Sequence, residues 1–164
     1  MVWNFEILKE VPIGGNYEEK FFGRDQSGNF TWIKFFYTTN IWYGVFQNGG
    51  LPNNLRVFVF QQIATVLSDG LVYVIDLLNR DTTLIQRSKN AFQDLITDDY
   101  SSFAADYNTI HVIENGELVK IIEGYYFDQF RFVAITETMV LAEYYQFGGD
   151  WSPLEIDRKM LKIK

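Results

Sequence analysis

The stretch Thr109-Ile-His-Val-Ile-Glu-Asn-Gly-Glu-Leu-Val-Lys-Ile-Ile122 decides the fold class. Two runs rich in branched and apolar residues, 109–113 and 117–122, flank the sequence Glu114-Asn-Gly116. Branched side chains favour strands, and the Asn-Gly pair readily adopts the positive φ angles of a tight type I′ turn. The stretch is therefore predicted to be a β-hairpin.

The same pattern of short apolar strands and turn residues extends outward in both directions. The turn sequence Ser68-Asp-Gly70 joins a second predicted hairpin. We expect about ten to twelve strands, with the clearest at 30–37, 41–46, 55–60, 63–67, 71–76, 109–113, 117–122, 130–135, 139–145 and 154–157. Only residues 83–95, with Arg87, Lys89 and Asn90 on a polar side, suggest a helix.

A weak internal repeat appears when residues 63–85, 103–122 and 133–163 are aligned. Each segment places a small residue (Ala64, Ala104 or Ala134) in a strand that is followed by a turn and a further strand, a rhythm similar to that of β-propeller blades. The alanines are 40 and then 30 residues apart, so no fixed period is established. The sequence predicts an all-β fold of antiparallel hairpins and meanders, arranged as a sandwich, an open barrel or a small propeller-like assembly.

Length and composition place the chain in one class of protein. At 164 residues it is expected to form a single domain, residues 1–164, around one core. It has no cysteine, which is typical of a reducing compartment. The first ten residues are too charged for a signal peptide, and no apolar run approaches the roughly 18 residues of a membrane span. We therefore expect a cytoplasmic protein that does not enter membranes.

No motif in the sequence indicates catalysis, a cofactor or a metal. The glycine pairs 14–15, 49–50 and 148–149 lack the context of a phosphate-binding loop and are interpreted as turns. The only histidine, His111, lies within a predicted strand and is expected on its outward face. A hydrolytic carboxylate pair would have to come from Asp98, Asp99, Glu137 and Glu143, but the sequence does not fix their separation. Asp94, Asp98 and Asp99 do not follow the order of a calcium loop. We predict a non-enzymatic protein.

Charge is the most informative feature of the sequence. The net charge is −7, yet residues 1–93 are neutral, with eight acids and eight bases. Residues 94–157 contain thirteen acids against Lys120 and Arg131 alone, a net of −11, and the tail 158–164 returns +4. Such a negative region repels nucleic acid and anionic lipid and attracts basic proteins. It also fits a simpler role in keeping the protein soluble.

The predicted partner is therefore a basic protein, rather than nucleic acid or a membrane. Acidic surfaces speed the association of basic partners, and neighbouring aromatic side chains provide anchoring contacts. The residues predicted to bind the partner are Asp94, Asp98, Asp99, Asp106, Glu114, Glu117, Trp42, Tyr43 and Tyr100.

Scattered aromatic segments give the chain a family resemblance. Phe22-Gly-Arg-Asp25, Ile41-Trp-Tyr-Gly-Val-Phe-Gln-Asn-Gly49, Val72-Tyr-Val-Ile-Asp76, Arg131-Phe132, and Trp151 before Leu154-Glu-Ile-Asp157 resemble small all-β bacterial proteins. Some of these are immunity proteins encoded beside secreted or contact-delivered toxins. The resemblance implies a cytoplasmic antidote that binds a toxin domain, often a basic nuclease, and blocks its active site. It transfers no site residue.

Two alternatives come from other functional classes. The chain could be a structural module of propeller-like hairpins that pairs with itself, which would make its sedimentation depend on concentration. It could also be a carbohydrate-binding β-protein in which exposed Trp42 and Trp151 form a stacking platform for sugar rings. The sequence leaves the oligomeric state open.

Overall fold

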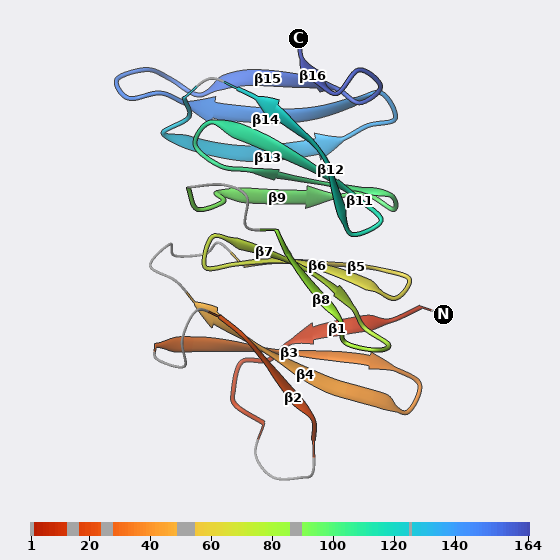
Figure 1. The fold of residues 1–164 in the computed structure, drawn as a ribbon. Coiled ribbons are helices and arrows are strands. Elements are labelled where there is room, and N and C mark those ends of the chain that lie inside the picture. The colour runs from red at the N-terminus through yellow and green to blue at the C-terminus, as the bar shows by residue number, and fades with distance from the viewer. Residues whose placement is uncertain (1, 13–16, 24–27, 49–54, 86–89, 125) are drawn as a thin grey trace.

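The chain folds entirely into β-structure arranged as four sheets of four strands. A computed structural model (Figure 1) describes residues 2–12, 17–23, 28–48, 55–85, 90–124 and 126–164. Sheet 1 holds β1 (Asn4–Ile7), β2 (Glu19–Phe22), β3 (Asn29–Tyr37) and β4 (Asn40–Asn48). Sheet 2 holds β5 (Arg56–Phe60), β6 (Ile63–Ser68), β7 (Leu71–Asp76) and β8 (Thr82–Ile85). Sheet 3 holds β9 (Asp94–Thr97), β10 (Ser101–Ala105), β11 (Thr109–Glu114) and β12 (Glu117–Glu123). Sheet 4 holds β13 (Gln129–Ile135), β14 (Met139–Tyr145), β15 (Ser152–Asp157) and β16 (Lys162–Ile163).

Sheets 2, 3 and 4 share one topology. In each, the four strands follow in chain order and pair antiparallel, as in the meander of a propeller blade. Sheet 1 differs, because its order is β1-β3-β4-β2 and β2 pairs parallel to β4. The predicted hairpin at Asn115-Gly116 is present, and both residues have positive φ angles, +49° and +81°.

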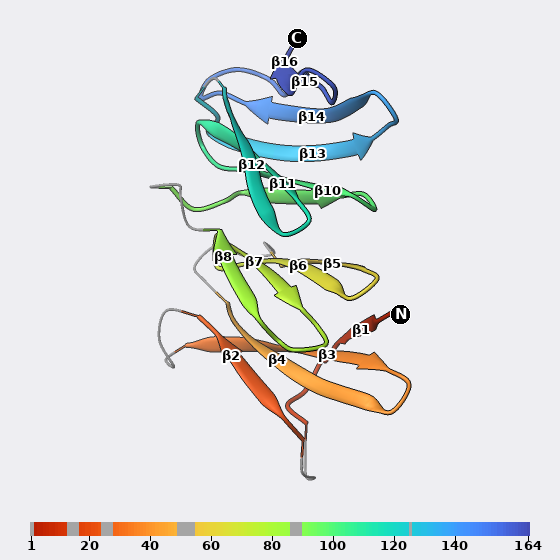
Figure 2. The ribbon, with the colours of Figure 1, turned by 45° about the vertical axis from the view of Figure 1, so that its right-hand side comes forward.

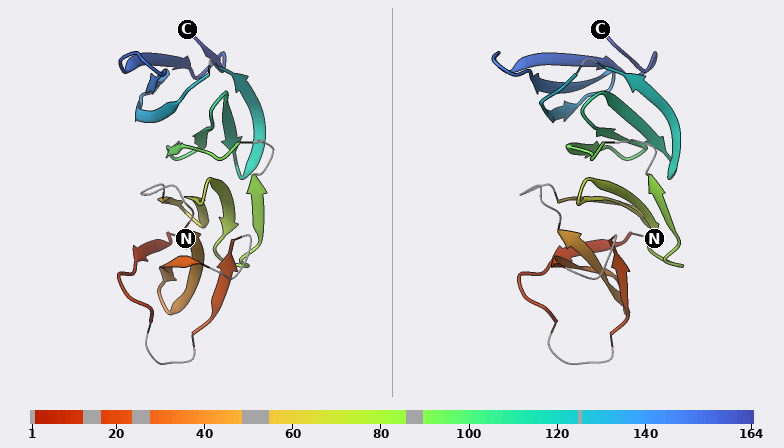
Figure 3. Two further views of the ribbon diagram at one scale, coloured as in Figure 1. Left: turned by 90° about the vertical axis from the view of Figure 1, so that its left-hand side faces the viewer. Right: turned by 60° about the vertical axis from the view of Figure 1, so that its left-hand side comes forward.

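The sheets stack face to face in chain order, forming a sandwich-like fold. Figure 2 shows sheet 1 at the lower end and sheet 4 at the upper end, and Figure 3 shows that the stack curves. Each of the three interfaces is filled by a separate cluster of buried apolar side chains. All-β structure and antiparallel pairing were predicted from the sequence and are confirmed.

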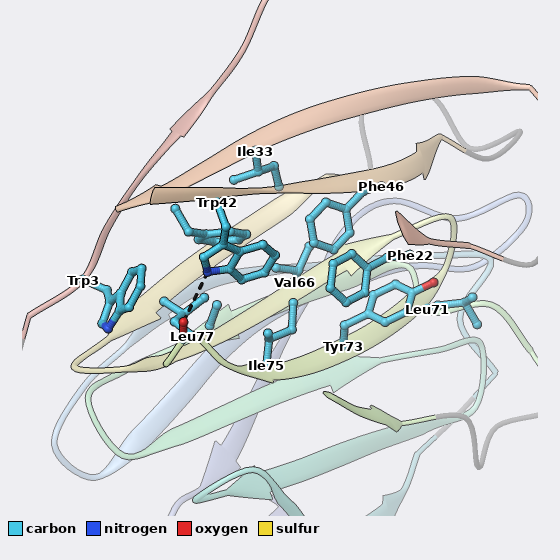
Figure 4. Packing of buried hydrophobic residues seen from close by; sticks show 12 residues of the cluster. Trp3, Phe22, Ile33, Trp42, Phe46, Val66, Leu71, Tyr73, Ile75 and Leu77 are labelled. Atoms are coloured by element: carbon cyan, nitrogen blue, oxygen red, sulfur yellow. Dashed lines mark hydrogen bonds between the residues drawn. The ribbon is translucent and has the colours of Figure 1, made fainter. Parts of the chain in front are cut away.

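Aromatic side chains dominate the core between sheets 1 and 2 (Figure 4). Phe22 stacks on Phe46 with ring centroids 4.5 Å apart, and the ring of Phe35 lies 4.8 Å from that of Trp42. The indole N–H of Trp42 donates a hydrogen bond to the carbonyl of Leu77, in the β7–β8 turn of sheet 2, at 3.2 Å. The aromatic share of the sequence therefore builds this interface.

The structure corrects the alignment of the internal repeat. Ala64 and Ala104 occupy equivalent places, because each lies buried in the second strand of its sheet and packs toward the preceding sheet. The equivalent residue of sheet 4 is Ala142 in β14, whereas Ala134 lies in the first strand, β13. The correct spacings are thus 40 and 38 residues, which are more regular than the sequence alignment indicated.

Two other expectations were wrong. The described residues form sixteen strands, more than the ten to twelve expected, because β1, β2, β8 and β16 are edge strands too short to show alternation. Residues 83–95 are not a helix in their described part: Thr83 to Ile85 belong to β8, and Asp94 and Leu95 to β9. Residues 86–89, and the glycine pairs 14–15 and 49–50, lie outside the described residues.

One buried carboxylate connects three of the four sheets. Asp94 of sheet 3 is 5% exposed. Its Oδ2 accepts a hydrogen bond of 2.8 Å from the backbone N–H of Phe132 in sheet 4, and its Oδ1 lies 3.1 Å from Nε of Arg56 in sheet 2. β13 is an edge strand, so this N–H would otherwise lack a partner in its own sheet. Asp94 therefore fixes the first strands β5, β9 and β13 relative to one another.

We predict that Asp94→Ala lowers the free energy of unfolding by about 3 kcal/mol, because it removes a charge-assisted hydrogen bond and the ion pair with Arg56 and leaves the half-buried N–H of Phe132 without its acceptor. Asp94→Asn keeps an acceptor oxygen and should cost less. Urea denaturation measures both, with the exposed Asp99→Ala as the control, expected to change the free energy by less than about 0.5 kcal/mol. Equal values for Asp94→Ala and Asp99→Ala would contradict the structural role of Asp94.

Candidate functional site

A cavity of about 430 Å³ lies between sheets 2 and 3. It is lined by the β5–β6, β9–β10 and β11–β12 turns, which lie on one side of the stack, on the right in Figure 1. Its lining residues come from these turns and from the adjoining strands: Phe58, Phe60, Gln61, Gln62, Ile63, Thr65, Thr97, Asp98, Asp99, Tyr100, Ser101, Ser102, Ile113, Asn115 and Gly116.

The cavity begins where large apolar side chains give way to small hydroxyl ones. Farther inside the same interface, Leu67, Val72 and Leu95 are among the side chains that pack the two sheets together. Toward the mouth, Thr65 and Ser102 replace them, and both are buried. Short polar side chains leave more space between two sheets than leucine or phenylalanine would, and they furnish the cavity floor with hydrogen-bonding groups.

The floor hydroxyls form a chain across the interface. The hydroxyl of Thr97 donates to Oγ of Ser102 at 2.7 Å. Oγ of Ser102 in turn lies 3.4 Å from Oγ1 of Thr65 in sheet 2. The second contact is long for an O–H···O hydrogen bond, so the link to Thr65 is weak.

The β9–β10 turn forms one side of the mouth. Oδ1 of Asp98 accepts hydrogen bonds from the backbone N–H groups of Tyr100 and Ser101, at 2.9 and 2.8 Å. Its Oδ2 pairs with the guanidinium of Arg158 from the β15–β16 turn. These contacts hold the turn so that Asp99 and Tyr100 project outward, and the ring of Tyr100 lies 6.0 Å from that of Phe60.

The β11–β12 turn forms the other side. Asn115 and Gly116 line the cavity, and Glu114 and Glu117 pair directly across the hairpin beside them. A Cβ atom on Gly116 would lie 3.2 Å from the side chain of Val74 in sheet 2. The sharp turn and the close approach to sheet 2 both favour glycine at this position.

Five of the nine residues predicted from the sequence therefore come together. Asp98, Asp99 and Tyr100 line the cavity. Glu114 and Glu117 lie at the same end of sheet 3 but on its other face, because the neighbouring pair Ile113 and Leu118 faces sheet 2. They converge because residue 101 of β10 pairs with residue 114 of β11, which places both turns at one end of sheet 3. We call this set of five residues the acidic end.

The other four predicted residues lie elsewhere. Trp42 is 1% exposed in the core between sheets 1 and 2, so it provides neither a partner contact nor a sugar platform. Asp94 is buried in the contacts between sheets, and Asp106 is buried in the β10–β11 turn at the opposite end of sheet 3. Tyr43 lies on the outer face of sheet 1, where its ring is 5.0 Å from that of Tyr17. The order of acidic and aromatic residues in the sequence did not show which of these side chains would be buried in the fold.

His111 is buried, not on an outward strand face as predicted. It is 1% exposed, and its ring meets Phe92 edge-on with the centroids 4.9 Å apart. Its Nε2 lies 2.9 Å from the hydroxyl of Thr109, which donates to Asp106 at 2.9 Å. Because the Thr109 hydroxyl donates to Asp106, its oxygen accepts a hydrogen bond from Nε2–H of His111. Nδ1 is buried without a hydrogen-bond partner in the described part of the chain. Burial lowers the pKa of His111, and the nearby charge of Asp106 opposes this only in part.

The other candidate carboxylates do not join the cavity. Glu143 pairs with Arg131 on the outer face of sheet 4, and Glu137 lies exposed in the β13–β14 turn. Among the described residues, no group of three histidine, aspartate or glutamate side chains is placed to hold a metal ion. Within those residues there is also no helix that could cross a membrane.

Sequence reasoning missed the floor and one wall of the cavity. Phe58, Phe60, Gln61, Gln62, Thr65, Thr97 and Ser102 were not singled out. A signal was present in two of them, since Thr65 and Ser102 are hydroxyl residues inside otherwise apolar strands. No protein-family model matches the chain, and comparison with curated proteins also finds no match.

The lowered pKa of His111 predicts acid sensitivity. The unfolded chain takes up a proton near pH 6.5, whereas the folded chain resists protonation until lower pH. The contribution of neutral His111 to stability is complete above about pH 6.5 and is lost as the pH falls through the lowered folded pKa. Urea denaturation between about pH 7.5 and 5 should show this loss, and His111→Gln should reduce the slope. Parallel pH profiles for the two proteins would refute the assignment.

Proposed function

We propose that this chain is a non-enzymatic binding protein that captures a basic protein partner at the acidic end. The observation that supports this most directly is that Asp98, Asp99, Glu114 and Glu117 lie at one end of sheet 3, where Asp98 and Asp99 also line an aromatic-lined cavity. Carboxylates gathered at one end of a sheet create a negative potential there that attracts cations. The aromatic ring of Tyr100, 76% exposed, offers an anchor of the kind that contributes strongly to protein interfaces.

We further propose that the protein acts as an immunity-type inhibitor in the cytoplasm. A net charge of −7 complements the basic surface typical of nucleases, and capture by a preformed acidic end would cover such a surface without chemistry. The absence of cysteine supports a reducing compartment. The resemblance to small all-β immunity proteins supports the same function.

Reversing charge at the acidic end should abolish most binding to a basic probe. We expect the double variant Asp99→Lys/Glu117→Lys to bind a labelled peptide of alternating Arg, Lys and Gly at least about tenfold more weakly, because each reversal replaces an attraction with a repulsion. Fluorescence anisotropy at about 50 mM salt measures the affinity. Binding by the unmodified chain should also weaken at about 0.5 M salt, where exposed charges are screened.

The control variant Glu123→Lys/Asp150→Lys changes the net charge by the same amount on the opposite side of the stack. Glu123 ends β12 there, Asp150 lies in the β14–β15 turn, and both are exposed. This variant should weaken binding by less than about threefold, since its charges lie beyond the screening length from the acidic end. If the two double variants lose affinity equally, only net charge matters and the acidic end is not a site.

Self-association is a second candidate function, favoured by the outer face of sheet 1. Phe21, Phe30 and Trp32 form a row of ring contacts on this face, with centroids 5.5 and 6.3 Å apart, and Val45 pairs with Phe21 and Trp32 on the same face. An apolar sheet face can stack on that of a second copy. We expect Ile41→Lys, at an exposed position on this face, to return any dimer to monomer in sedimentation velocity experiments. A monomer at all concentrations would exclude this function.

The carbohydrate platform is not supported. Its first tryptophan, Trp42, is buried, and the ring of the second, Trp151, has the guanidinium of Arg131 4.3 Å from its centroid. The two tryptophans also lie in different sheets, at opposite ends of the stacking order. They do not form one surface.

A further inference from the structure

We propose that the cavity between sheets 2 and 3 receives an arginine side chain of the basic partner. This inference rests on the proposed function and specifies which group the partner inserts. It follows from three features of the cavity: an aromatic wall, a floor of hydroxyl groups, and an acidic mouth.

The aromatic wall suits a flat cation. Phe60 contributes from the end of β5 and Tyr100 from the β9–β10 turn, with the rings inclined at 57°. The hydrogen bonds that Asp98 accepts from the backbone N–H groups of Tyr100 and Ser101 fix the turn that carries Tyr100. Guanidinium groups stack on such rings through cation–π attraction and planar contact.

The floor offers several hydrogen-bond acceptors. Thr65, Thr97 and Ser102 contribute hydroxyl groups, and Gln61 and Gln62 of the β5–β6 turn also line the cavity. The guanidinium of arginine has five N–H donors directed in a plane, whereas an ammonium is a compact charge that holds its water more strongly. A cavity of about 430 Å³ can admit the three methylene groups and the guanidinium together.

The mouth holds one carboxylate that already binds a guanidinium and one that does not. Asp98 is paired with Arg158 of this chain. Asp99, its exposed neighbour, forms no ion pair with any described residue. The intramolecular contact of Asp98 shows that this turn accommodates a guanidinium at its edge, and Asp99 remains to pair with one from a partner.

The test compares three five-residue peptides, acetylated and amidated, that differ only in a central arginine, lysine or citrulline. Citrulline keeps the shape of arginine without its charge. Titration into ¹⁵N-labelled full-length protein, followed by NMR, gives both the affinity and the location of binding. We expect the arginine peptide to bind about tenfold or more tightly than either of the others. The shifts should centre on the amides of Gln62, Ser102 and Gly116.

Two isosteric variants probe separate parts of the cavity. Asp99→Asn removes the free charge at the mouth and should weaken the arginine peptide by about tenfold. Thr65→Val replaces a floor hydroxyl with a methyl group of equal size and should weaken it about threefold or more. Asp150→Asn, on the opposite side of the stack from the cavity, should leave the affinity unchanged. Thermal unfolding of each variant shows whether a lost affinity reflects lost folding.

The outcomes separate this inference from the proposed function. Equal affinity for the arginine and lysine peptides, or shifts centred outside the cavity, would overturn the arginine slot while leaving a general acidic binding surface intact. Failure of all three peptides, together with failure of the longer basic peptide, would overturn both. Selective arginine binding that Asp99→Asn and Thr65→Val weaken would establish the slot.

Discussion

The structure depends on the fact that its two middle sheets are apolar on both faces. In β6, Val66 packs toward sheet 1 and Leu67 toward sheet 3, and neither is exposed to solvent. β10 behaves in the same way, with Ala104 facing sheet 2 and Phe103 facing sheet 4. An antiparallel sheet that is apolar on both sides has to be covered on both sides, so these sheets require a neighbour above and below. The stack of four sheets is the direct result.

Apolar contact is not directional, so it does not by itself fix the position of one sheet relative to the next. A few polar contacts between the sheets fix that position. Asp94 links sheets 2, 3 and 4 at their first strands, and the indole of Trp42 links sheet 1 to sheet 2. The hydroxyl of Ser68 donates to the carbonyl of Gln47 across the same pair of sheets. Charged and polar residues that could have been assigned to a binding surface thus hold the layers in register.

The cavity is the place where this packing is incomplete. Large side chains such as Leu67, Val72 and Leu95 pack between sheets 2 and 3, and the cavity lies where Thr65, Thr97 and Ser102 contribute its lining. The β9–β10 and β11–β12 turns lie next to each other at that end of sheet 3, so the acidic residues in and beside them are also close together. Under the proposed function, stability and binding belong to different parts of one interface, and the bound group would occupy space outside the apolar core.

The sequence by itself determined the all-β class, the antiparallel hairpins and the position of tight turns such as Asn115-Gly116. These features follow from local rules, namely alternation of apolar residues and backbone angles that glycine and asparagine tolerate. It also indicated the acidic half of the chain. Only the tertiary structure decided which acids face solvent: it buried Asp94 and Asp106 and left Asp99 exposed. The reason is physical, because burial depends on which sheet covers a residue, and that depends on contacts between segments far apart in the sequence.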